Sequence, residues 1–284
     1  MVAMASGVSR RLFVSGSLAA LVGAAALTIP ASGCSVFEPP VEETRTSQLA
    51  HVVGSAISVE TANGAISVET SDQAKEVTVV AKLKGTSKER LDATKVLAER
   101  KPDNSLSIYV KWPNDSRDGG EGCSFEIKLP DVNGATLKSS NGALTLVGAS
   151  GDASLKSSNG AVKVSRHTGE LKVKTSNGAI TAEGINGPAE LDTSNGAITL
   201  TLTAAAAGQV HLDTSNGAIT LAVGKAFAGE LSAKTSNGSV AVPEGAGVKV
   251  LSKDKHHAKV SFGDGGKDSK VTSSNGSITI RRAE

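Results

Sequence analysis

The sequence predicts an all-β protein, a single-stranded β-solenoid (β-helix) with coils of about 18–21 residues and a strand–helix–strand insertion near its N-terminal end. Three observations point to this fold class. One phrase close to Ser-Asn-Gly-Ala-Ile-Thr-Leu recurs through the 284 residues, apolar and polar residues alternate around each copy, and aromatic residues make up only 2% of the chain. With so few rings, the core has to be filled by regular layers of Val, Ile, Leu and Ala.

The Asn-Gly pair of this phrase marks one corner of each predicted coil. Successive copies are first 18 residues apart, then 21, and the last step is 38. Equivalent residues of a solenoid stack at about 4.8 Å, so the Asn side chains can hydrogen-bond from coil to coil. We therefore expect structural turns at Asn141, Gly142, Asn159, Gly160, Asn177, Gly178, Asn195, Gly196, Asn216, Gly217, Asn237, Gly238, Asn275 and Gly276, with a looser copy at Asn63.

Period-two positions on both sides of each corner are apolar and are expected to face inward. Before the Asn these are Leu137, Leu155, Val173, Leu191, Leu212, Ala233 and Val271, and after it Leu144, Val162, Ile180, Ile198, Ile219, Val240 and Ile278. The alternate positions should face outward. Before the turn they are Lys138, Lys156, Lys174, Asp192, Asp213 and Lys234.

A meander of β-hairpins is the alternative fold. Asn-Gly is a strong hairpin signal because both residues tolerate positive φ. Such a meander would need an unusually large open sheet, since open sheets rarely exceed about 10 strands. The joint persistence of length, register and residue identity favours the solenoid.

The N-terminus has the features of a lipoprotein signal peptide over residues 1–33. Arg10 and Arg11 precede an apolar run over residues 12–27, which closes on Ala31-Ser32-Gly33-Cys34. We expect lipidation at Cys34. An ordinary cleaved signal peptide is the alternative, and the two arginines also resemble a twin-arginine export signal.

Residues 34–48, with Pro39-Pro40, are expected to form a tether. No later stretch approaches the roughly 20 apolar residues of a membrane-spanning helix. The chain is therefore expected to be lipid-anchored in the cell envelope, at the outer membrane facing the periplasm or the cell surface, because Ser35 rather than Asp follows the cysteine.

Residues 49–284 are expected to form the solenoid domain, with an elaborated N-terminal block at 73–132 and regular repeats at 133–284. Within the block, strands are predicted at 76–84, 105–112 and 124–129. A helix is predicted from Ser87 to about Arg100, with Thr86 and Glu89 as its capping box. The block should cover one end of the stack. Residues 253–262 read as a degenerate coil, with His257 near the Asn position and Val260 and Phe262 pointing inward.

The repeats, preceded by Phe125-Glu126-Ile127-Lys128-Leu129-Pro130, resemble a bacterial family of β-strand-repeat proteins described as putative adhesins. The resemblance covers roughly residues 50–282. It implies a β-helical surface domain. The family has no agreed activity, so the resemblance supplies no catalytic residues.

Residues able to do chemistry are sparse. Asp192 and Asp213 occupy equivalent positions in successive coils, about 5 Å apart, a separation compatible with a retaining glycosidase. The simpler interpretation is that both are solvated members of an outward row, because such carboxylates need a cleft. His256 and His257 are adjacent but lack a third ligand for a metal. Cys123 reads as a small residue within a strand.

We therefore expect a non-enzymatic, lipid-anchored envelope protein, an adhesin or structural surface, without cofactor or metal. The alternative is a carbohydrate-active enzyme that uses Asp192 and Asp213. Expected partners are the membrane, through the lipid anchor, and an envelope or extracellular glycan or protein surface. The net charge of +2 argues against nucleic acid. A strip of outward Ala and Thr could pack on such a partner, although these residues also suit exposed strands. The strip comprises Ala143/Thr145, Ala179/Thr181, Ala197/Thr199, Ala218/Thr220 and Ser277/Thr279. Lys163 and Ala241 interrupt its row of Thr.

Overall fold

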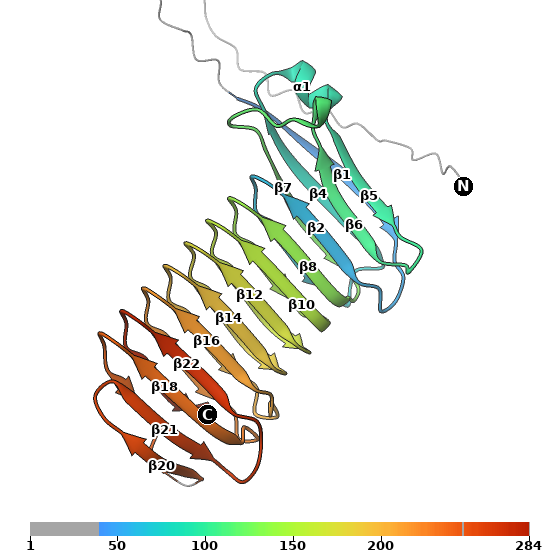
Figure 1. Ribbon diagram of the computed structural model, residues 1–284. Coiled ribbons are helices and arrows are strands. Elements are labelled where there is room, and N and C mark those ends of the chain that lie inside the picture. The colour runs from blue at the N-terminus through green and yellow to red at the C-terminus, as the bar shows by residue number, and fades with distance from the viewer. Residues whose placement is uncertain (1–39, 246, 284) are drawn as a thin grey trace, which may run out of the picture. The chain divides into compact units, whose positions relative to one another are not determined.

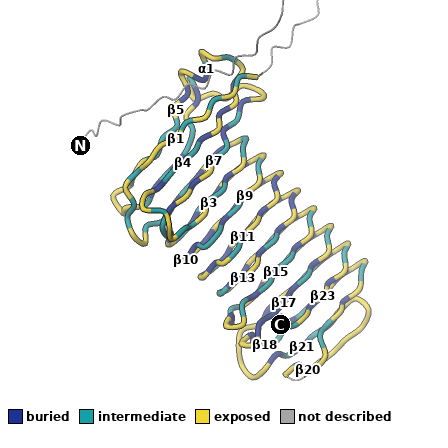
Figure 2. The backbone as a smooth tube through the Cα atoms, turned by 180° about the vertical axis from the view of Figure 1, so that it is seen from behind, coloured by how far each residue is buried: buried dark blue, intermediate teal, exposed yellow. Residues whose placement is uncertain are grey.

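The computed structural model describes residues 40–245 and 247–283. The expected signal peptide, Cys34 and the first part of the tether lie outside these residues. The described part is a stack of β-coils that confirms the all-β solenoid (Figures 1 and 2). Among the described residues, no helix has the length and apolar character needed to span a membrane.

Each coil contributes one strand to each of two parallel sheets. The strands that precede the Asn-Gly corner form face A, which Figure 1 shows from the front. In spatial order they are β2 (Ile57–Thr61), β8 (Asn133–Ser139), β10 (Ser150–Ser157), β12 (Leu171–Thr175), β14 (Ala189–Thr193), β16 (Val210–Thr214), β22 (Ser269–Ser273) and β18 (Gly229–Thr235).

The strands that follow the corner form face B, seen from behind in Figure 2. They are β3 (Ile66–Thr70), β9 (Leu144–Val147), β11 (Val162–Thr168), β13 (Ile180–Asn186), β15 (Ile198–Leu202), β17 (Ile219–Val223), β23 (Ile278–Arg282) and β19 (Val240–Ala241).

Register between coils follows the repeat. Leu155 lies between Leu137 and Val173 on face A, and every stacked pair of regular coils is parallel. The two strands that flank a corner pair with neighbouring coils and form no antiparallel hairpin with each other; β10 and β11 meet only at one parallel bridge, Ser150 to Thr168. The hairpin meander is therefore wrong. All the apolar positions expected to face inward are buried.

At both ends of the stack, the coils are not in chain order. The coil of β2 and β3 lies between the coil of β8 and β9 and that of β6 (Leu106–Lys111) and β7 (Gly122–Leu129). At the other end, β22 and β23 come last in the chain but lie between β16/β17 and β18/β19. The first and last coils of the chain are thus both held between two others.

Antiparallel strands cover the two ends. On face A, β5 (Lys95–Arg100) pairs with β6 at one end, while β21 (His257–Phe262) pairs with β18 and with β20 (Val248–Lys253) at the other. On face B, β4 (Glu76–Gly85) pairs with β7 and with β1 (Val41–Ala50). α1 (Lys88–Ala93) and the 3₁₀ turn η1 (Pro113–Asp115) complete the N-terminal block.

Four local predictions are wrong. Residues 41–48 of the expected tether are part of β1, which pairs antiparallel with β4. The helix is shorter than expected, because residues 95–100 form a hairpin with β6. Its cap is Ser87, whose Oγ accepts from the N–H of Arg90, and not Thr86. Residues 253–262 are not a degenerate coil, since β21 runs antiparallel to β18 and its His257 is opposite Lys234; Val260 and Phe262 do point inward.

Candidate functional site

The asparagines of the corners form one continuous hydrogen-bonded ladder. Each Nδ2 donates to the Oδ1 of the neighbouring coil at 2.6–2.9 Å, in the spatial order Asn63, Asn141, Asn159, Asn177, Asn195, Asn216, Asn275, Asn237. At the first end, the Nδ2 of Asn63 donates to the backbone carbonyl of Glu121 at 3.2 Å. The ladder passes through the C-terminal coil before it reaches Asn237. The 38-residue step between Asn237 and Asn275 contains the additional strands β20 and β21.

A second ladder runs beside it inside the stack and was missed in the sequence. The Ser or Thr two places before each Asn is buried, and its hydroxyl donates to a backbone carbonyl of the neighbouring coil. The acceptor is the carbonyl of a corner glycine in every case except Thr61, which donates to the carbonyl of Cys123. The signal was present, because the residue two places before the Asn is Ser or Thr in every copy. The donors are Thr61, Ser139, Ser157, Thr175, Thr193, Thr214, Ser273 and Thr235.

The corner glycines are needed for close stacking. A Cβ on Gly178 would overlap the carbonyl oxygen of Gly160, and the same holds at each regular corner of the stack. None of the ladder asparagines has positive φ, and neither does Gly178. At the seven regular corners the Asn-Gly pairs therefore serve the stacking of coils, and the left-handed backbone of a hairpin turn plays no part.

Face A carries a row of charged side chains, which we call the charge row. In spatial order it consists of Glu60, Lys138, Lys156, Lys174, Asp192, Asp213, Thr272 and Lys234, one from each of the eight strands. Lys174 Nζ donates to Asp192 Oδ2 at 3.0 Å, and this hydrogen bond raises the pKa of Lys174. Lys138, Lys156 and Asp213 form no ion pair with any other residue that the structure describes.

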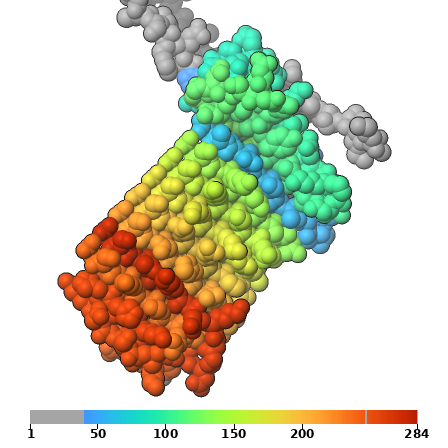
Figure 3. Space-filling model, in the orientation of Figure 1, coloured from blue at the N-terminus to red at the C-terminus, as the bar shows by residue number. Residues whose placement is uncertain are grey.

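Asp192 and Asp213 are direct neighbours across β14 and β16, as the sequence predicted. Both are half-exposed on an open face, which Figure 3 shows as a broad surface without a deep cleft over the described residues. A shallow depression of about 110 Å³ on the same strands is lined by Glu170, Pro188, Ala189, Glu190, Gln209 and His211. Neither aspartate lines it, so the geometry gives no support to a glycosidase site.

Face B carries the predicted strip of Ala and Thr. Thr181, Thr199, Thr220 and Thr279 lie in direct register on four successive strands. Lys163 separates Thr145 from this run, and Ala241 ends it. The alanine row beside it is exposed. Face B thus carries a strip of small groups repeated at strand spacing, beside exposed charged side chains such as Glu183 and Arg281.

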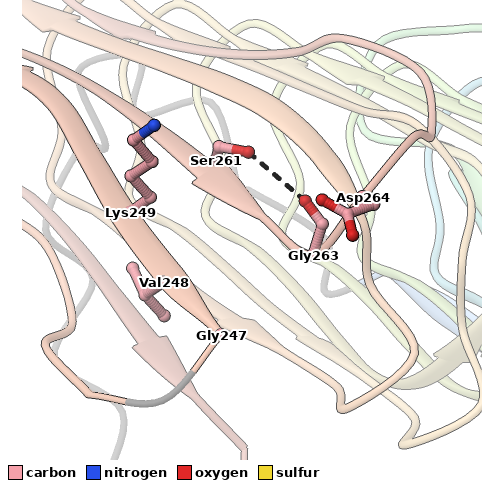
Figure 4. A pocket seen from close by; sticks show the side chains of 6 residues that line it. All are labelled: Gly247, Val248, Lys249, Ser261, Gly263 and Asp264. Atoms are coloured by element: carbon pink, nitrogen blue, oxygen red, sulfur yellow. Dashed lines mark hydrogen bonds between the residues drawn. The ribbon is translucent and has the colours of Figure 1, made fainter.

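A second depression, of about 360 Å³, lies at the C-terminal end of the stack (Figure 4). It is lined by Gly247, Val248, Lys249, Ser261, Gly263 and Asp264. Ser261 Oγ donates to the Gly263 carbonyl at 3.4 Å, but no ion pair joins Lys249 to Asp264. The lining side chains converge on no common point, so this depression has no recognisable chemistry.

The remaining candidate residues have structural surroundings. Cys123 is buried in β7, and this burial raises the pKa of its thiol to about 12, so the reactive thiolate is suppressed. The backbone N–H groups of His256 and His257 donate to the Asp254 carboxylate at 2.7 and 2.8 Å. His256 thus lies in the turn between β20 and β21, and His257 is the first residue of β21. Within the described residues, no group of three or more His, Cys, Asp or Glu could hold a metal ion.

The N-terminal block contains a buried carboxylate that no sequence pattern indicates. Glu121 is fully buried and accepts from Arg90 Nε at 2.6 Å, Arg90 Nη2 at 3.0 Å and the N–H of Asp118 at 2.7 Å. Burial alone would raise the pKa of Glu121, but the bonds from Arg90 and Asp118 outweigh burial and lower it. This cluster ties α1 to the loop before β7.

Residues 57–281 match the Toastrack DUF4097 family, and the chain belongs to this family of β-solenoid domains. A comparison with curated proteins found no match.

Two solved structures are similar at low identity. A putative cell adhesion protein from Clostridium sporogenes ATCC 15579 is 13% identical with a TM-score of 0.37, over 86% of this chain and 100% of that chain. A putative adhesin from Bacteroides fragilis NCTC 9343 is 12% identical with a TM-score of 0.28, over 85% and 97%. Likenesses at this level support no statement about function.

Proposed function

We propose that this chain is a lipid-anchored, non-catalytic protein of the bacterial cell envelope that binds a partner surface through face B. The observation that carries the proposal is the in-register run of Thr181, Thr199, Thr220 and Thr279 beside an exposed alanine row. A flat, rigid array of small hydroxyl and methyl groups suits contact with another extended surface, such as an envelope or extracellular glycan or a protein sheet. The rigid parallel stacking keeps the array ordered before binding, which limits the entropy cost.

The anchor belongs to the same proposal. Cys34 at the end of the N-terminal apolar run would receive the lipid, which would hold the solenoid at the membrane, the outer one in a cell with two membranes. Cys34→Ser should move the protein from the membrane fraction to the soluble fraction. Unchanged fractionation of this variant would contradict lipidation at this residue.

Binding through face B is tested with residues 38–284 immobilised on beads and exposed to whole cells, purified envelope polysaccharide and a second copy of the chain. Thr199→Glu should weaken retention at least tenfold, because it places a carboxylate in the middle of the run. Ser158→Glu is the matched control, since Ser158 is exposed on the corner beside the Asn ladder and away from face B. If both variants are retained like the unmodified chain, face B is not the binding surface.

A further inference from the structure

The charge row on face A is self-complementary when it is read in the reverse direction. Its spatial order is Glu60, Lys138, Lys156, Lys174, Asp192, Asp213, Thr272, Lys234. Reversing the row places Lys174 opposite Asp192, Lys156 opposite Asp213, Glu60 opposite Lys234, and Lys138 opposite the neutral Thr272. No like charges meet.

We propose that face A is the interface of an antiparallel homodimer, in which a second copy of this chain packs face to face about a two-fold axis. The axis runs parallel to the strands and passes between β12 and β14. Such an isologous interface uses the same patch on both copies, so each contact occurs twice. The proposal concerns face A and does not depend on the proposed role of face B.

The monomer has unfavourable charge contacts that this dimer relieves. Lys138, Lys156 and Lys174 lie on three successive strands, and like charges directly opposite one another across strands are destabilising. Lys138, Lys156 and Asp213 have no ion pair among the described residues. In the dimer, Lys156 and Asp213 of each copy gain an opposite charge. The existing Lys174–Asp192 pair becomes part of a four-charge network at the axis.

A second outward row supports the same register. Lys172 and Glu190 are opposite each other in the register of β12 and β14, so the same axis sets Lys172 of one copy against Glu190 of the other. Within one copy, Lys172 forms its ion pair with Glu170. Other arrangements fail. A shift by one coil sets Lys174 against Lys174 or Asp192 against Asp192, and a parallel arrangement sets every charge against itself.

The available area is sufficient for a weak specific dimer. Eight strands at about 4.8 Å spacing and about 16 Å of strand length give roughly 600 Å² per copy. The total of about 1,200 Å² is at the low end of specific interfaces. Because its complementarity is mainly electrostatic, this dimer should dissociate as salt screens the charges.

Sedimentation of residues 38–284 tests the proposal, since the described residues form a compact unit with its own core. At 50 mM salt we expect a monomer–dimer equilibrium, and at 500 mM salt a monomer. Lys156→Glu should weaken dimerisation at least tenfold. The double variant Lys156→Asp with Asp213→Lys restores opposite charges, and its dimer dissociation constant should return to within threefold of that of the unmodified chain. Lys163→Glu on face B is the control and should leave it unchanged.

Disulfide trapping tests the register directly. Lys138→Cys with Thr272→Cys should give a covalent dimer on oxidation. Within one chain these positions are five strands apart, about 24 Å, so they cannot bridge internally. Lys138→Cys with Lys174→Cys should not cross-link.

A monomer at 50 mM salt and every concentration, or a dimer that Lys156→Glu leaves intact, would overturn the proposal. The proposal would also be overturned if the chain never self-associates but binds polyphosphate through its three lysines, because the charge row would then bind an anionic partner.

Discussion

The corner of each coil depends on three residues that bond to the neighbouring coil. The Asn amide continues the exposed ladder, the buried hydroxyl two places earlier holds the neighbouring carbonyl, and the glycine admits the close approach. A buried carbonyl that loses its hydrogen-bond donor still pays the cost of desolvation. Removing a buried hydroxyl should therefore lower the free energy of unfolding more than removing an exposed hydroxyl does.

Thr193→Val should lower the free energy of unfolding by about 1–3 kcal/mol, because it removes the hydroxyl that donates to the Gly178 carbonyl at 3.0 Å with little change of shape. Thr199→Val is the matched control on exposed face B and should change it by no more than about 0.5 kcal/mol. Chemical denaturation of both variants measures the difference. Equal effects would mean that the buried hydroxyl contributes nothing specific.

Gly178→Ala should be more disruptive still. Its Cβ would overlap the Gly160 carbonyl oxygen, and backbone on both coils would have to move apart. We expect a loss of more than about 3 kcal/mol, or failure to fold. Gly119→Ala is the control, since nothing lies near a Cβ there and its φ is not positive. A thermal melt in which both variants match the unmodified chain would contradict the close-stacking argument.

Among the elements, α1 and its surroundings depend on a buried ion pair. The carboxylate of Glu121 binds Arg90 on α1, while Arg45 of β1 donates to the carbonyls of Leu91 and Thr94 at the end of the helix. A helix of this length has little stability of its own. Its position therefore rests on these contacts.

Glu121→Gln should destabilise the chain by about 3 kcal/mol at pH 7, because it breaks a buried pair and leaves Arg90 poorly compensated. The pKa of Glu121 is lowered in the folded chain. Its carboxylate therefore contributes stability that is fully present above the unfolded pKa of about 4.3 and is lost as the pH falls through the folded pKa. Denaturation between pH 6 and 3 should show a smaller loss for the variant than for the unmodified chain. Parallel pH profiles would exclude this role.

The elements also show what the sequence could and could not predict. Period-two alternation located the strands of the regular coils, because inward and outward faces repeat with every copy. Residues 95–100 fall within the predicted helix, and their Lys, Leu, Ala, Glu and Arg favour one, but hairpin pairing with β6 overrides that propensity. Glu121 lies in a loop without periodicity and binds Arg90, which is 31 positions away in the sequence. No sequence pattern therefore predicts this contact.

At the scale of the whole stack, the order of the coils was not predictable for a physical reason. The repeats are nearly identical, so β22 fits beside β16, β14 or β18 with the same inward residues and the same Asn and hydroxyl bonds. The local pattern therefore specifies register but not which coil is the neighbour. The antiparallel strands β20 and β21 decide it, because they occupy the end of the stack beside β18.

This order makes two deletions of equal length unequal in effect. Removing residues 160–177 joins Asn159 to Gly178, preserves the corner phrase and lets neighbouring coils pair in the same register. The shortened chain should fold cooperatively, with a modestly lower Tm, as expected when stability sums over nearest-neighbour coils. Removing residues 267–284 is also an 18-residue deletion, but it takes out β22 and β23 from between two coils.

That second deletion should leave the edges of β16 and β18 unpaired and facing each other across a missing layer, and exposed edges promote aggregation. Circular dichroism melts and size-exclusion chromatography of the two variants at equal concentration measure the contrast. A C-terminal deletion that remains soluble with an unchanged Tm would show that β22 and β23 are dispensable. The position of the last coil between two others would then contribute nothing to stability.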